Sequence, residues 1–92
     1  MKAINIEDAR RIAVSKLREL QQEVECDLEL IDQDTAETML GWVFFYNSAE
    51  FLRTGDALWA LAGNSPLFVS RDGALIELPT HQPWQQSVAE ME

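Results

Sequence analysis

The stretch Gly41-Trp42-Val43-Phe44-Phe45-Tyr46 lies near the middle of this 92-residue chain. Successive side chains of a β-strand point to opposite faces of its sheet, and here both faces receive apolar residues. They divide as Trp42, Phe44 and Tyr46 on one face and Val43 and Phe45 on the other. A strand that is apolar on both faces is normally central and covered on both sides. We therefore predict a central strand over residues 38–46, with other elements packed above and below it.

The residues that precede this strand predict an amphipathic helix over Ile6–Val24. Its apolar residues recur in alternating steps of three and four, which places them on one face of a helix. They are Ile6, Ala9, Ala13, Leu17, Leu20 and Val24. Asn5 is the expected N-cap, and Asp8 follows where a carboxylate meets the positive end of the helix. A helix with one apolar face is expected to lie on a sheet.

Three further strands and a short helix follow from the remaining patterns. Cys26–Leu30 alternates apolar with acidic residues, as a half-buried strand does. The dipeptide Asp72-Gly73 predicts a β-hairpin between strands Leu67–Ser70 and Ala74–Leu78. Pro83 suits the first turn of a final helix.

The least regular segment is residues 47–64. Asn47 and Glu50 have the spacing of a capping box for a short helical turn, which Gly55 can end. Asp56 can cap a second turn that contains Trp59. This segment is therefore expected to form short turns between the central strand and the hairpin.

These elements predict an α+β fold over residues 1–92 as a single two-layer domain. The N-terminal amphipathic helix packs on an antiparallel sheet of about four strands, and a short helix ends the chain. The long helix covers one face of the sheet, so residues 47–64 or the last helix must cover the other. Otherwise an apolar face is exposed, which indicates a partner or a second copy in a homodimer.

The charge of the chain is acidic and unevenly distributed. Seven Lys and Arg residues stand against 16 Asp and Glu residues, a net charge of −9, which argues against a nucleic-acid partner. No base lies between Arg18 and Arg53, whereas nine acids do. Such a region can speed encounter with a basic partner, although an acidic surface can equally serve solubility alone. The candidate partner-binding residues are Asp27, Glu29, Asp32, Asp34, Glu37 and, as an aromatic anchor, Trp59.

The sequence offers little for catalysis. A single cysteine, Cys26, excludes an internal disulfide and is expected to be a buried structural thiol. A single histidine, His81, excludes metal sites with several histidines, and no glycine pattern forms a phosphate-binding loop. We expect no enzymatic activity, no metal and no cofactor. Residues 1–11 carry no apolar signal-peptide core, and no run reaches the ~20 apolar residues of a membrane helix, so a cytoplasmic protein without membrane contact is expected.

From residue 41 onward the chain carries an ordered set of short motifs. They are Gly41-Trp42-Val43-Phe44-Phe45-Tyr46-Asn47, Thr54-Gly55-Asp56, Gly63-Asn64-Ser65-Pro66, Leu78-Pro79-Thr80 and Pro83-Trp84. In this order and spacing the sequence resembles the immunity protein 35 family, also called YrhB-type domains. The match runs from about Trp42 to Trp84, and the preceding helix and hairpin agree in order.

The resemblance implies a bacterial, non-enzymatic α+β protein of a polymorphic toxin system. Such a protein binds a cognate toxin and keeps it inactive in the producing cell. A second role attached to this type of domain is that of a heat-stable, chaperone-like or general interaction protein, which would use an exposed apolar sheet face. The motif residues are most simply structural, as turn formers and core residues: Gly41, Trp42, Gly55, Asp56, Gly63, Asn64, Pro66 and Trp84.

Overall fold

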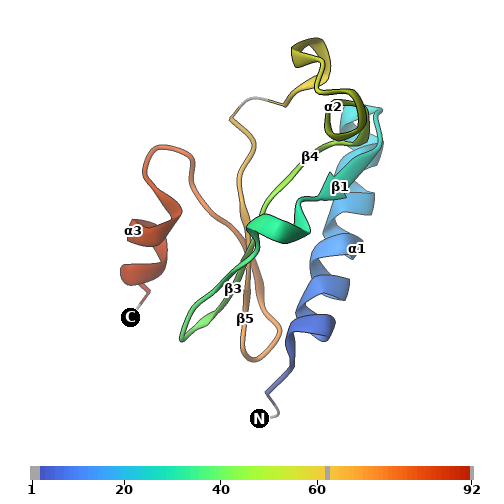
Figure 1. Cartoon of the computed structure of the whole chain (residues 1–92). Coiled ribbons are helices and arrows are strands. Elements are labelled where there is room, and N and C mark those ends of the chain that lie inside the picture. The colour runs from blue at the N-terminus through green and yellow to red at the C-terminus, as the bar shows by residue number, and fades with distance from the viewer. Residues whose placement is uncertain (1–2, 62, 92) are drawn as a thin grey trace.

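The computed structural model describes residues 3–61 and 63–91. The N-terminal half contains α1 (Ile6–Val24), β1 (Leu28–Leu30), the 3-10 turn η1 (Asp32–Asp34), β2 (Ala36–Glu37), β3 (Gly41–Phe44) and β4 (Tyr46–Ser48). The C-terminal half contains α2 (Ala49–Thr54), the 3-10 turn η2 (Ala57–Trp59), β5 (Leu67–Ser70), β6 (Leu75–Glu77) and α3 (Trp84–Ala89). Figure 1 shows α1 and α3 on opposite sides of the strands. The predicted α+β fold is confirmed.

The long helix α1 has the predicted bounds because its first turn is capped in both directions. The Asn5 side chain accepts a hydrogen bond from the Asp8 backbone N–H at 2.9 Å, and the Asp8 carboxylate accepts one from the Asn5 backbone. The apolar stripe buries Ala9, Ala13 and Leu17 against the sheet. The helix ends at Glu25, whose φ of 56° turns the chain back toward β1.

The main sheet is antiparallel and has the strand order β2-β3-β5-β6. Its centre is the pair β3–β5, in which Trp42 lies opposite Val69. Gly41 is required at the end of this pair, because a Cβ atom there would lie 2.1 Å from the Val69 carbonyl oxygen. The predicted hairpin is confirmed as β5–β6, with its turn at Arg71–Gly73.

The prediction of one continuous strand over residues 38–46 is wrong. Residues 38–40 form the turn between β2 and β3, where the Thr38 hydroxyl accepts hydrogen bonds from the backbone N–H groups of Leu40 and Gly41. At Phe45 the chain leaves the main sheet, and β4 pairs with β1 in a separate two-stranded sheet. The partner strand β5 begins at Leu67, opposite Phe44, so the main sheet offers no further pairing beyond this point. The first predicted strand also begins later, at Leu28 rather than Cys26.

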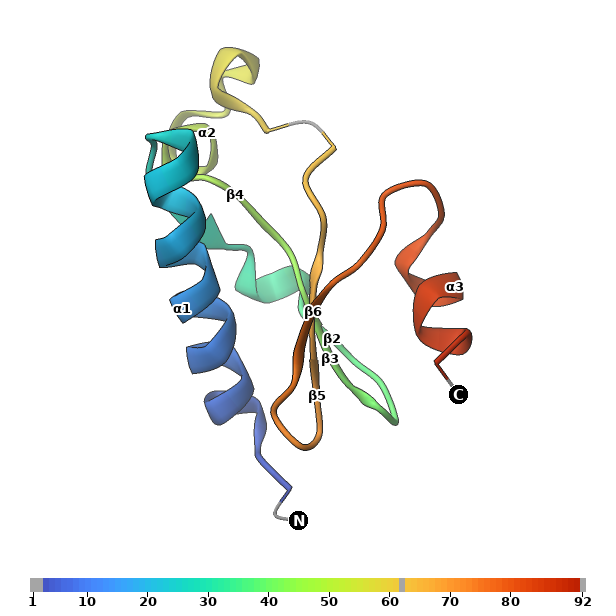
Figure 2. The ribbon, with the colours of Figure 1, turned by 180° about the vertical axis from the view of Figure 1, so that it is seen from behind.

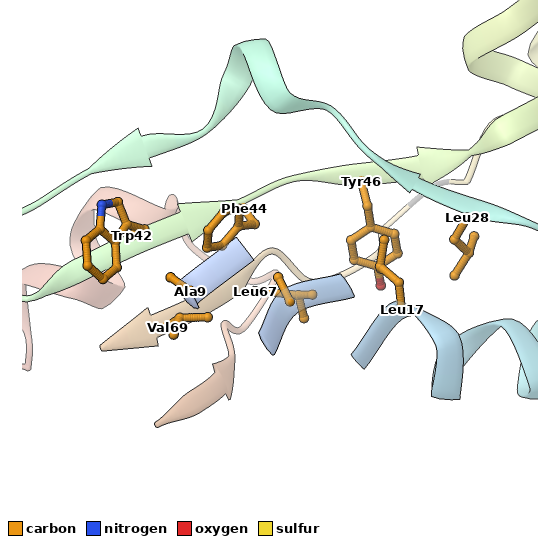
Figure 3. Packing of buried hydrophobic residues seen from close by; sticks show 9 residues of the cluster. Ala9, Leu17, Leu28, Trp42, Phe44, Tyr46, Leu67 and Val69 are labelled. Atoms are coloured by element: carbon orange, nitrogen blue, oxygen red, sulfur yellow. The ribbon is translucent and has the colours of Figure 1, made fainter. Parts of the chain in front are cut away.

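Both faces of the main sheet carry a buried apolar cluster. Figure 3 shows Trp42, Phe44 and Tyr46 directed toward α1 together with Leu67 and Val69. The opposite face buries a second cluster that contains Val43, Phe68, Leu78 and Val88, with Phe45 and Trp84 packed against it. The rings of Phe45 and Trp84 meet edge to face at 6.3 Å. Helix α3 thus adds a partial third layer (Figure 2), and on the same face Ile76 of the edge strand β6, opposite Phe68, stays exposed.

The irregular segment after β4 is fixed by two polar residues at its start. The Ser48 side chain, rather than that of Asn47, caps α2 by accepting a hydrogen bond from the Phe51 N–H at 3.0 Å. The Asn47 carboxamide oxygen instead accepts from the N–H groups of Ser48 and Leu61, both at 2.8 Å. Gly55 ends α2 with a φ of 74°, as predicted, because the left-handed region favours glycine.

Candidate partner-binding surface

The five candidate carboxylates lie on one continuous segment, residues 27–37, which we call the acidic segment. It runs from the residue before β1 through η1 to β2 (Figure 1). All five side chains are exposed, whereas Leu28 between two of them is buried against α1. The fold therefore presents these carboxylates to solvent and uses the intervening apolar residue as an anchor.

Two of the five carboxylates are paired with arginines of the same chain. Asp32 accepts hydrogen bonds from Arg10 Nε at 2.8 Å and Arg10 Nη2 at 2.9 Å, and this contact lowers the pKa of Asp32. Glu37 accepts from Arg71 Nη2 at 3.0 Å. Arg71 also stacks on the Trp42 ring, 4.4 Å from its centroid. Both acids are therefore partly neutralised within the free protein.

The other three carboxylates, those of Asp27, Glu29 and Asp34, have no ion-pair partner among the described residues. Their charge is directed to solvent. Because these are the acids that keep their full charge, they contribute most of the negative potential of the segment.

Two open hollows border the acidic segment. The first, of about 310 Å³, lies between α1 and β1 and is bordered by Arg10, Arg18, Glu29 and Asp32. Gln21 also lines this hollow, and its carboxamide oxygen accepts a hydrogen bond from the Leu28 N–H at 2.8 Å. This bond satisfies one backbone N–H group on the unpaired edge of β1. Charges of both signs line this hollow.

The second hollow, of about 240 Å³, brings Asp27 and Trp59 together at one end of the acidic segment. Its lining consists of Cys26, Asp27, Ser48, Ala49, Glu50 and Trp59. The Trp59 side chain is 48% exposed. Cys26 is half-buried and packs against the main core, so its thiol is more accessible than predicted. Sequence reasoning counted Glu50 among the acids between Arg18 and Arg53 but assigned it only to a helix cap.

The position of Trp59 is set by its backbone. The buried Ser48 hydroxyl donates a hydrogen bond to the Trp59 carbonyl at 2.6 Å while it caps α2. Asp56 caps η2 by accepting from the Leu58 N–H at 3.0 Å. The same short segment exposes Leu58, at 82%, and Leu52, at 39%. With Trp59, these are three of the eight exposed large apolar side chains among the described residues, and neighbouring exposed apolar side chains can mark a protein contact.

The remaining motif residues make structural contacts. Trp42 is buried, and Trp84 packs against the core cluster beneath α3. Asn64 Nδ2 donates a hydrogen bond to the Tyr46 carbonyl at 2.9 Å, and the Pro66 carbonyl accepts one from the Leu78 N–H at 2.9 Å. Burial raises the pKa of the Tyr46 hydroxyl. Gly63, like Gly55, adopts a positive φ, of 75°.

The remaining candidates for chemistry are the single histidine and the two hollows. His81 is exposed in the loop before α3. No group of three or more potential ligands is placed to hold a metal within residues 3–61 and 63–91. Both hollows are at or below the small end of the ~300–1,000 Å³ range of ligand pockets. None of the described helices has the length and apolar character needed to cross a membrane.

Comparison with known proteins agrees with the resemblance of the sequence. The family model described as Immunity protein 35 matches residues 7–90. Over 53 residues the chain is 38% identical to a protein of Escherichia coli (strain K12) described as "Uncharacterized protein YrhB". That match covers 56% of each protein, so the chain spans about half the length of this curated relative. No solved structure matches the chain.

Proposed function

Because the chain belongs to the immunity protein 35 family, we propose that it binds a cognate protein toxin and neutralises it by occlusion, without chemistry of its own. Family membership implies toxin neutralisation in general. The contact residues and the mechanism are our proposal. The acidic segment and Trp59 form the contact surface, and the described parts of α1, the main sheet and α3 serve as its rigid support.

The observation that carries this proposal is the exposed charge of Asp27, Glu29 and Asp34 on a single segment, where these acids have no ion-pair partner among the described residues. Toxins that act on nucleic acids need a basic groove to hold phosphates. Carboxylates on a rigid surface can occupy such a groove in place of the phosphates, which blocks substrate and steers association. The expected partner is therefore a toxin with a cationic active-site surface.

The chaperone-like alternative loses its supporting feature. It required an open apolar sheet face, but Val43 and Phe68 on the second face are buried in a cluster with Val88 of α3, while Ile76 of the edge strand β6 stays exposed. The same burial removes the reason to expect a homodimer through that face.

The test is co-expression with candidate toxin domains, scored by cell survival and by co-purification. The double variant Glu29→Lys/Asp34→Lys reverses two unpaired charges of the acidic segment. The control, Glu7→Lys/Glu90→Lys, makes the same charge change at exposed sites on α1 and beyond α3. We expect loss of protection and of the complex for the first variant only. Equal protection by both variants would show that the acidic segment is not the contact surface.

A further inference from the structure

The second hollow combines an aromatic face with two carboxylates. Trp59 is one of the residues that line it, and Asp27 and Glu50 contribute the acids. Ser48 cannot serve as a further polar contact there, because its hydroxyl is buried and already bonded to the Trp59 carbonyl and the Phe51 N–H. Charge and shape together favour a cationic group that is flat enough to stack on an indole.

The same chain already contains this arrangement in filled form. Arg71 lies over the Trp42 ring at 4.4 Å, and its Nη2 is 3.0 Å from a carboxylate oxygen of Glu37. An indole, a guanidinium and a carboxylate thus form a stable group within this fold. At Trp59 the indole and the carboxylates are present, and no described cation lies over the ring.

Arg53 shows that Glu50 is placed to bind a guanidinium. Its Nη2 lies 2.6 Å from each of the two carboxylate oxygens of Glu50. Arg53 itself does not line the hollow, and its side chain is 69% exposed. An exposed ion pair of this kind is weak, so a cation that enters the hollow can compete for Glu50.

We propose that this hollow is a subsite for an arginine side chain of the toxin, held between the Trp59 indole and the carboxylates of Asp27 and Glu50. Arginine is favoured over lysine because a planar guanidinium both stacks on an aromatic ring and bonds a carboxylate with two N–H groups. The volume of about 240 Å³ suits one side chain of a partner rather than a small-molecule substrate. This inference rests on the proposed function for the identity of the partner only.

The first experiment uses the full chain without any toxin. The ¹⁵N-labelled protein is titrated with N-acetyl-arginine amide and, separately, with N-acetyl-lysine amide at equal ionic strength. We expect the Trp59 indole signal to shift and saturate with the arginine probe and to shift less with the lysine probe. The indole signal of the buried Trp42 should stay in place with both probes. Equal shifts with arginine, lysine and salt alone would overturn the proposal.

Two kinds of variant are expected to change the affinity for the arginine probe in opposite directions. Asp27→Asn and Glu50→Gln weaken binding of the arginine probe by about two- to fivefold, the range of a single exposed charge contact. Arg53→Ala strengthens it by a factor of about two to five, because the competing guanidinium is removed. A purely structural role for Arg53 would not produce tighter binding. The matched control Glu7→Gln removes an equal charge from the first turn of α1 and leaves the titration unchanged.

The second experiment measures affinity for the toxin with Trp59→Leu and with the control Met39→Ala, which changes an exposed apolar residue outside the hollow and outside the turns that carry Trp59. We expect about a two- to fivefold loss for Trp59→Leu, the size of an exposed cation–π contact, and less for the control. If Trp59→Leu binds as the unsubstituted protein does while charge reversal in the acidic segment abolishes binding, the arginine subsite is wrong and the proposed function stands. If no toxin binds but the arginine titration succeeds, the proposed function is wrong and the subsite stands.

Discussion

Replacing Ser48 with alanine tests whether one hydroxyl holds the turns that carry Trp59. The hydroxyl is buried, so water cannot replace it, and it makes two hydrogen bonds, to the Phe51 N–H at 3.0 Å and to the Trp59 carbonyl at 2.6 Å. Loss of a helix N-cap costs about 1 kcal/mol. Loss of a second buried hydrogen bond costs about 1 kcal/mol more. We expect Ser48→Ala to lower the free energy of unfolding by about 2 kcal/mol.

Thermal unfolding followed by circular dichroism measures this loss. For a domain of this size, about 2 kcal/mol corresponds to a fall in Tm of about 8–16 °C. The control is Ser15→Ala, which changes an exposed serine in α1 and is expected to stay within about 0.5 kcal/mol of the unsubstituted protein. If Ser48→Ala melts at the same temperature as this control, the hydroxyl does not fix the segment, and our account of how Trp59 is positioned is refuted.

Three further predictions follow from other contacts. Because Arg10 lowers the pKa of Asp32 in the folded state, the ion pair stabilises the protein above the ordinary aspartate pKa of about 3.9, and this stability is lost as the pH falls through the lowered folded value. Because both side chains are at least half exposed, the ion pair is expected to contribute less than about 1 kcal/mol. Urea unfolding should therefore show Asp32→Asn to be less stable than the unsubstituted protein by this amount at pH 6, and the two proteins to be equally stable at pH 2. Gly41→Ala should lower the free energy of unfolding by about 3 kcal/mol or more, because the new Cβ meets the Val69 carbonyl oxygen at 2.1 Å. In Gly55→Ala the new Cβ meets no atom within 4 Å, so this variant should lose only about 1 kcal/mol, for its positive φ. Thermal melts of the two variants compare these losses. The rate of association with the toxin should fall about tenfold or more between low and high salt in stopped-flow measurements, and a salt-independent rate would contradict charge steering by the acidic segment.

The sequence predicted correctly those helices and strands whose bounds depend on neighbouring residues in the chain. The bounds of α1 followed from the Asn5–Asp8 cap and the spacing of its apolar residues, and the hairpin followed from Asp72-Gly73. The division of the central strand into two faces was also correct, because alternation persists through Phe45. For the same reason the break at Phe45 could not be predicted, since it depends on where the neighbouring strands β1 and β5 begin and end.

The candidate site was predicted in its residues but not in its contacts. Nothing in the local sequence shows that Arg10 reaches Asp32, because this pair depends on how α1 lies on the sheet. Likewise, Asp27 and Trp59 come together only when the buried Ser48 ties η2 back to β4. Charge counting identified the acidic segment, but tertiary structure decides which of its acids are neutralised.

The departure of the chain from the main sheet at Phe45 separates two sets of residues with different freedom to change. The largest fully buried side chains all lie in β3, in β5 or just after β6: Trp42, Val43, Phe44, Leu67, Phe68, Val69 and Leu78. The small β1–β4 sheet and the turns that follow it contribute none of them. Exposed residues there can therefore be exchanged without opening a cavity in the interior. With such an architecture, substitutions at the surface can change which partner the protein binds during evolution, while the buried residues that stabilise the fold stay the same.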